Sequence, residues 1–251
     1  MLVGSDDEHP AVLRSCRPAS GSVRIFGAYP ARVTPPVVKV LRFDLRQLAS
    51  AQPGLDRILP PEERAVAPVR RVARAATRLV LAEELGVAPD QVVITRNCEH
   101  CGDPEHGRPV VAGAPVAFSV AHSGGTGLLA LASGDRRALG VDIEEVRPRR
   151  RLEALATRVL TPEEYTRFRA ASPEERLRAF LRDWTAKEAF LKAIGTGITR
   201  PMRSVVVPAG WSSTEVDVGA EAVAALAIDA PAVQVGVADW SGLSVNDGTE
   251  D

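Results

Sequence analysis

The stretch that decides the fold reads RDWTAKEAFLK and runs from residue 182 to residue 192. It lies in a predicted helix whose start is marked by Ser172, because serine caps helix N-termini and Glu175 can close a capping box onto it. Gly195 marks the end of the helix. Apolar residues recur between these limits at steps of three and four, which predicts one buried face: Leu177, Phe180, Leu181, Trp184, Leu191 and Ile194.

Three charged residues of this helix stand on or beside its apolar side. Glu188 follows Trp184 by one turn, Lys192 follows by one more, and Lys187 flanks the same edge. The commonest meaning of such a pair is an exposed ion pair, which contributes only about 0.3 to 0.5 kcal/mol. Two observations favour a phosphate site instead: the pair follows the buried face, and only three lysines occur among the 31 basic residues. A compact ammonium suits a pyrophosphate where the rigid fork of arginine would not fit.

Two further carboxylates lie on a predicted strand over residues 139–146. Asp142 and Glu144 point to one face of that strand, while Val141 and Ile143 point to the other. Neighbouring carboxylates repel unless a cation lies between them, although an edge strand with its acidic face in water is the plainer alternative. Together with Glu188 they make an all-oxygen set of the kind that Mg²⁺ accepts while it keeps waters and contacts phosphate.

The remaining elements are predicted from shorter patterns. A helix covers residues 69–85, and another begins at a capping box of Thr161 and Glu164. Strands are predicted over residues 37–45, 118–123, 128–132, 205–207, 224–228 and 233–237. His122 lies at a strand end, next to Ser123 and two glycines whose backbone N–H groups can bind an anion. A lone histidine is more often structural, but this position favours anion binding.

Composition limits the class of protein. Of the 251 residues, 45% are hydrophobic and 25% charged, and the formal net charge is −1, which predicts a globular protein that does not bind nucleic acid. No apolar run is long enough to span a membrane, and no secretory signal precedes the first strand. Cys98 and Cys101, with His100 or His106, form at most half of a structural zinc site, so incidental cysteines are favoured. We expect a cytoplasmic monomer.

Two motifs together resemble the signature of the 4'-phosphopantetheinyl transferases. The first is GVDIE at residues 140–144, and the second is WTAKEA at residues 184–189, followed by Lys192. The long, two-lobed, surfactin-synthetase-activating type is the better match. Three supporting segments fall in the family's order within residues 37–240: GRP at 107–109, the strand and turn over 118–124, and TPEE at 161–164.

The resemblance implies an α+β fold of two similar lobes related by a pseudo-twofold axis, with coenzyme A held between them. The lobes would comprise residues 23–130 and 131–245, the second carrying the metal site, with a disordered leader over 1–22 and a disordered tail over 246–251. The implied activity is Mg²⁺-dependent transfer of 4'-phosphopantetheine from coenzyme A to a serine of an apo acyl or peptidyl carrier protein, which releases 3',5'-ADP.

The resemblance also implies roles for the residues of the metal site. Asp142, Glu144 and Glu188 would hold Mg²⁺ on the pyrophosphate of coenzyme A. Glu188 would also take the proton from the carrier serine. Lys192 would bind phosphate, and Lys187 is a weaker candidate for the same role.

The implied coenzyme site draws on the first half of the chain. His122, with Ser123 beside it, would contact the 3'-phosphate, and Arg108 would take a lysine's role at the nucleotide. Glu63 and Val66 stand where some members have lysines, and Ala121 stands where the family often has serine. Cations of the first helix would compensate, from the set Arg70, Arg71 and Arg74.

Other functions stay open at this point. The same carboxylates could serve a Mg²⁺-dependent hydrolase of pyrophosphates or phosphodiesters, or the chain could be a non-catalytic homologue that binds coenzyme A or a carrier. A zinc-stabilised adaptor built on the two cysteines is a third alternative. A basic cluster would attract the acidic helix of a carrier protein: Arg147, Arg149, Arg150 and Arg151.

Overall fold

The computed structural model describes residues 23–27, 34–50, 55, 58–97, 107–197 and 201–240. The predictions of a leader and of a tail, and the question of zinc at Cys98 and Cys101, fall outside these residues. Within them, no helix is long and apolar enough to cross a membrane.

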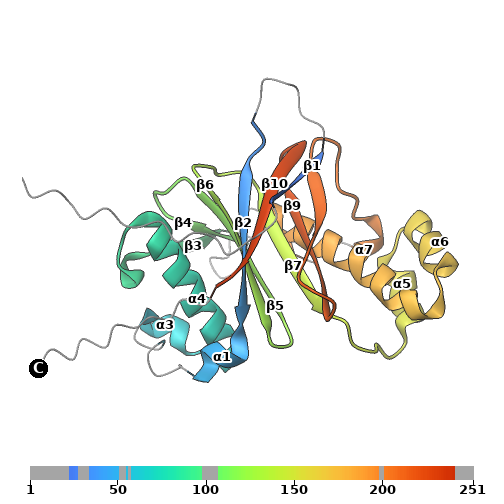
Figure 1. The fold of residues 1–251 in the computed structure, drawn as a ribbon, viewed down its shortest axis with the longest axis horizontal. Helices are drawn as coiled ribbons and strands as arrows, with labels where there is room; N and C mark the ends of the chain where they lie inside the picture. Colours follow the sequence, from blue (N-terminus) through green and yellow to red (C-terminus); the bar gives the residue numbers. More distant parts are fainter. Residues whose placement is uncertain are drawn as a thin grey trace, which may run out of the picture.

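Two sheets form the centre of the molecule (Figure 1). In the larger sheet β10 runs parallel to β2, and the other neighbours are antiparallel. Its order is β1 (Val23–Gly27), β10 (Ala232–Asp239), β2 (Val37–Asp44), β6 (Thr126–Ser133) and β5 (Val116–Ser123). The smaller sheet is antiparallel, in the order β7 (Leu139–Glu145), β9 (Ala222–Ile228) and β8 (Ser212–Val216). A separate hairpin pairs β3 (Ile94–Asn97) with β4 (Arg108–Val111).

Helices cover the outer face of each sheet, as Figure 1 shows. On the side of the larger sheet lie α1 (Leu45–Ser50), α3 (Pro61–Arg64) and α4 (Pro68–Leu85), followed by the 3₁₀ turn η1 (Pro89–Gln91). On the side of the smaller sheet lie α5 (Leu152–Val159), α6 (Pro162–Ala170) and α7 (Pro173–Ile194), followed by η2 (Met202–Ser204).

The apolar residues explain this layering. Along β6, Leu128 packs into a core shared by the two sheets, whereas its neighbour Leu129 packs against the helices of the first half. The same period of two holds on β7, where Val141 and Ile143 enter the core between the sheets. The opposite face of β7, which carries Asp142, therefore faces α7.

The two sheets also meet along β5 and β7. The hydroxyl of Ser119 accepts a hydrogen bond from the backbone N–H of Val141 at 3.1 Å, and the hydroxyl of Ser123 accepts one from Glu145 at 3.0 Å. These side chains replace a continuous backbone ladder between the two strands. They place the acidic strand β7 beside the strand end that carries His122.

The α+β class is confirmed, and so are most predicted elements; the pseudo-twofold relation between two lobes stays an expectation. The predicted strand over 205–207 is wrong, and β8 was missed. The capping box of Thr161 and Glu164 forms, but Ser172 makes no side-chain cap, because its hydroxyl donates to the Glu175 carboxylate. The expected boundary at residue 130 falls inside β6, and β10 returns to the sheet of the first half.

Candidate active site

The close contact of α7 with β7 builds the site. Gly140 on β7 lies directly under the helix: a Cβ atom there would collide with the backbone oxygen of Ala189 and lie 2.7 Å from the backbone nitrogen of Ala193. Only glycine lets the helix backbone approach this closely. The approach brings Glu188 and Lys192, one turn apart on α7, over the acidic face of β7.

Asp142 and Lys192 form the central pair of the site. Asp142 is 7% exposed, and the ammonium of Lys192 lies 2.7 Å from its Oδ1 and 3.2 Å from the carbonyl oxygen of Val141. The second carboxylate oxygen, Oδ2, is buried and has no hydrogen-bond partner among the described residues. A buried carboxylate oxygen without a donor is costly unless a ligand supplies the missing interaction.

Glu188 supplies the second such oxygen. Its Oε1 is buried without a partner in the described part of the chain. Burial raises the pKa of Glu188, the charge of Glu144 raises it further, and Lys192 opposes the shift. Burial also raises the pKa of Asp142 to about 6, against the opposing pull of Lys192 and with further increases from Glu188 and Glu144. The three carboxylates are therefore close enough to feel one another's charge.

Glu144 is held by two donors from outside its own strand. Arg149 donates from Nη2 to Oε2 at 2.6 Å, and the hydroxyl of Ser123 approaches the same oxygen at 3.4 Å. Arg149 was predicted, as one of four clustered arginines, to attract a carrier protein. The structure pairs it with Glu144, and its position five residues after Glu144, beyond Pro148, gave no signal of this pairing. The hydroxyl of Ser123, which was predicted to contact the coenzyme, also accepts a hydrogen bond from the backbone N–H of Glu145, between β5 and β7.

The carboxylate oxygens are suitable ligands for a hard divalent cation, but the described residues do not form a preorganised coordination site. Among the described residues, no three His, Cys, Asp or Glu side chains are gathered as a ready metal site. Lys192 and Arg149 each hold one oxygen of a carboxylate, while Asp142 and Glu188 each keep a buried oxygen without a partner. Oxygens of this kind are the ligands that Mg²⁺ takes in proteins. The donor set therefore fits the metal in its chemistry.

His122 links the carboxylates to the first half of the chain. Burial lowers the pKa of His122, and the positive charges of Lys192 and Arg70 lower it further. Arg70 is exposed near the start of α4. Cations from α4 and α7 thus converge on the end of β5, which keeps the imidazole neutral at neutral pH and makes the region attractive to an anion.

The remaining predicted coenzyme contacts are Arg108 and Arg74. Arg108 at the start of β4 donates from Nη1 to the carbonyl oxygen of Arg137 at 2.8 Å, and its backbone lies against Gly195 at the end of α7. Arg74 is half-buried on α4. No contact recorded among the described residues joins either of these arginines to the carboxylates.

The prediction for Lys187 is wrong. Its side chain is 3% exposed, and its ammonium lies 2.8 Å from a carboxylate oxygen of Glu164 and donates to the carbonyl oxygens of Met202 and Val205 at 3.0 Å each. With three acceptors and a side chain that is only 3% exposed, this ammonium is not placed to bind phosphate. It joins α7 to α6, to η2 and to Val205, the residue that follows η2.

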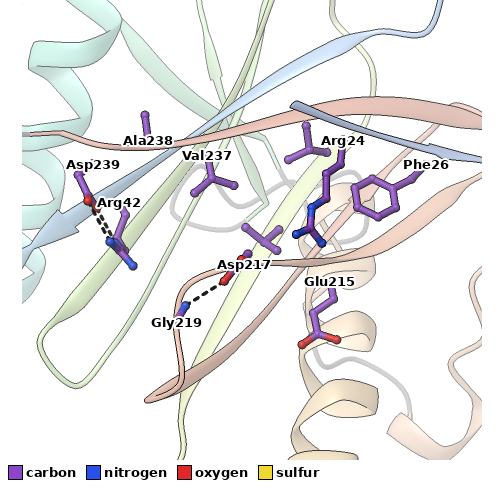
Figure 2. Close-up of a pocket in the computed structure, with 11 residues that line it drawn as sticks. Arg24, Phe26, Arg42, Glu215, Asp217, Gly219, Val237, Ala238 and Asp239 are labelled. Carbon is purple, nitrogen blue, oxygen red and sulfur yellow. Dashed lines mark hydrogen bonds and ion pairs between the residues drawn. The ribbon is translucent and has the colours of Figure 1, made fainter. Parts of the chain in front are cut away.

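A separate cavity lies away from the carboxylates (Figure 2). It has a volume of about 330 Å³ and lies where β1, β2 and β10 meet β8 and the turn after it. Arg42 closes one side through a bidentate pair with Asp239, at 2.6 and 2.9 Å. None of the predicted site residues lines this cavity.

Comparison with known proteins agrees with this geometry. The model of the 4'-phosphopantetheinyl transferase superfamily matches residues 138–227, which span β7, α7 and the elements between them. The 4'-phosphopantetheinyl transferase HetI from Nostoc sp. is 33% identical over 171 residues, which cover 62% of this chain and 68% of HetI.

This chain belongs to the 4'-phosphopantetheinyl transferase superfamily. The similarity extends to the 4'-phosphopantetheinyl transferase AcpT from Salmonella typhimurium, 39% identical over 128 residues that cover 51% of this chain and 60% of AcpT. The 4'-phosphopantetheinyl transferase Sfp from Bacillus subtilis is 34% identical over 104 residues, 41% of this chain and 44% of Sfp. The matches to AcpT and Sfp thus span less than two thirds of those proteins.

Proposed function

We propose that this chain transfers the 4'-phosphopantetheine group from coenzyme A to the hydroxyl of a serine in an apo carrier protein. The observation that carries the proposal is the meeting of Asp142, Glu144 and Glu188 with Lys192 at the contact of β7 and α7, in a segment that the superfamily model matches. Mg²⁺, held by these three carboxylates, would neutralise charge on the pyrophosphate of coenzyme A.

Phosphoryl transfer needs positioning and charge balance more than covalent work by the protein. A bond forms between the serine oxygen and the phosphorus of the phosphopantetheine, and the bond from that phosphorus to the 3',5'-ADP oxygen breaks. The serine proton passes to a carboxylate oxygen of Glu188. Burial favours this transfer, because it raises the pKa of Glu188 and so makes the carboxylate a stronger base.

The ammonium of Lys192 is suited to balance the negative charge that remains on the phosphates. Its side chain is 32% exposed, so the ammonium that holds Asp142 also reaches the open side of the site. A mobile ammonium on a flexible stem can follow a phosphate during the reaction. Lys192 therefore serves as the phosphate-binding cation of the proposal, and Lys187 has no part in it.

Binding of coenzyme A would use the neighbouring cations of the first half. His122 and Arg70 face the same region as Lys192 and would take the 3'-phosphate, with Arg74 further along α4. Arg108 would contact the nucleotide. The apo carrier would approach the exposed arginines after β7, which are Arg147, Arg150 and Arg151, because a carrier's acidic helix is attracted by a basic surface.

The test is the intact mass of apo carrier proteins after incubation with the chain, coenzyme A and Mg²⁺. Acyl and peptidyl carrier domains are both used, each with its acceptor serine replaced by alanine as the control. The proposal expects the mass of one phosphopantetheine group on the intact carriers and none on the alanine variants, with release of 3',5'-ADP. Breakdown of coenzyme A at the same rate without any carrier would support the hydrolase instead, and binding without turnover would support the non-catalytic homologue.

A further inference from the structure

The geometry points to Arg149 as a positioning residue for Glu144, acting from the segment that follows β7. This inference rests on the proposed function, since it concerns how the carboxylates are prepared for a divalent cation. Arg149 belongs to a basic cluster whose other members, Arg147, Arg150 and Arg151, are exposed. It differs from them by pointing inward.

The contacts of Arg149 show a side chain held at the site rather than in water. Its Nη2 lies 2.6 Å from Oε2 of Glu144, and the two side chains are 25% and 22% exposed. Its Nε is buried and has no hydrogen-bond partner among the described residues. A guanidinium that gives up hydration in this way does so where the charge-assisted pair offsets the loss.

The effect of Arg149 depends on which oxygen of the Glu144 carboxylate it contacts. Arg149 and the hydroxyl of Ser123 both address Oε2 of Glu144, and Ser123 is itself fixed by the backbone N–H of Glu145 at 3.0 Å. Two donors on one oxygen fix the rotation of the carboxyl group, so that Oε1 would be the oxygen left for a metal. Asp142 shows the same division, with Lys192 on Oδ1 and a buried Oδ2 without a partner.

Partners of this kind hold a metal ligand in its binding orientation, and their loss typically costs about 10- to 100-fold in metal affinity. A guanidinium can also act in the opposite way and compete with the metal for the same carboxylate. The two roles predict opposite changes in metal affinity when Arg149 is replaced. Loss of a positioning residue weakens metal binding, whereas loss of a competitor strengthens it.

The experiment measures binding of Mn²⁺, as the probe, to the full chain without coenzyme A or carrier, by the electron paramagnetic resonance signal of the free ion. The variants are Arg149→Gln, Arg149→Lys and the matched control Arg147→Gln, which removes the same charge from an exposed neighbour. We expect Arg149→Gln to weaken binding by about 10- to 100-fold, Arg149→Lys to recover part of this, and Arg147→Gln to change binding by less than about twofold. Melting temperatures of the three variants equal to that of the wild-type chain show that folding is intact.

Three results would overturn the inference in distinguishable ways. If the wild-type chain binds Mn²⁺ and Arg149→Gln binds it equally or more tightly, Arg149 does not position Glu144, and the proposed function stands. If the wild-type chain binds no Mn²⁺ at the site, the inference and the metal-dependent function fail together. An equal loss in Arg147→Gln and Arg149→Gln would show that the loss does not come from the pair of Arg149 with Glu144 and would likewise reject the positioning role.

Discussion

At the scale of single residues, the site is built from partly or fully buried charges balanced in pairs. Lys192 balances Asp142 and Arg149 balances Glu144, at 2.7 and 2.6 Å. The balance is incomplete, because burial still raises the pKa values of Asp142 and Glu188. Carboxylates in this state cost the folded protein stability at neutral pH, and a cation bound there would offset that cost.

Replacement of Asp142 tests this balance through pH. The pKa of Asp142 rises from 3.8 to about 6 on folding, so the folded chain holds this proton more tightly than the unfolded chain does. The stability that the folded chain gains from the protonated form of Asp142 is present below about pH 4 and is lost as the pH rises through 6. We therefore expect the melting temperature of Asp142→Asn, relative to wild type, to increase between pH 4 and pH 7, by on the order of 5 °C. A difference that does not change with pH would show that Asp142 ionises normally.

The sequence predicted the carboxylates of the site better than its lysines. The period of two placed Asp142 and Glu144 on one face of β7, and the helical period placed Glu188 and Lys192 toward it. Lys187 was misjudged, because spacing along α7 does not show that Glu164 and two carbonyl oxygens lie within reach. The pairing of Arg149 with Glu144 depends on the turn after β7 and was also beyond prediction.

At the scale of elements, the decisive feature is the contact of α7 with β7. A long amphipathic helix with a glycine end signal was predictable, and so were the strands with apolar alternation. β8 was missed because its buried inward positions include Ser212 and Thr214, which carry no apolar signal. The run over 205–207 looked like a strand, but the carbonyl of Val205 accepts a hydrogen bond from Lys187.

Gly140→Ala tests the contact of α7 with β7. The added methyl group would meet backbone atoms of Ala189 and Ala193, which cannot turn aside, so the helix must shift away from the strand. We expect a loss of about 1 to 3 kcal/mol in the free energy of unfolding, measured by urea denaturation, because overpacking of this kind typically costs that much. Lys192 would also move away from Asp142, which would lower the transfer rate.

The matched control is Gly127→Ala on β6. The three atoms nearest to a Cβ atom there would be side-chain atoms of Leu45 and Phe43, at 3.2 to 3.4 Å, and these can adjust. We expect Gly127→Ala to destabilise the chain less than Gly140→Ala does. Equal stability of Gly140→Ala and wild type would show that α7 does not depend on this close approach.

At the scale of the whole molecule, the proposed site needs parts that are far apart in the sequence. The acidic strand lies against β5 through Ser119 and Ser123, which brings His122 and the start of α4 toward Lys192. The last strand of the described residues, β10, lies between β1 and β2, so the sheet of the first half includes a strand from far along the sequence. Periodicity shows which residues face inward but does not reveal which strands pair, and the position of β10 could not be predicted for this reason.

The most direct test of the central claim is the transfer rate of Glu188→Gln. The change keeps the volume of the side chain and one oxygen but removes the base that would accept the serine proton. With an apo carrier and coenzyme A at saturating Mg²⁺, we expect the single-turnover rate to fall by roughly 10²- to 10⁴-fold, the usual contribution of a general base. Calorimetry should show that coenzyme A still binds. A Glu188→Gln chain that transfers phosphopantetheine at nearly the wild-type rate would contradict the account.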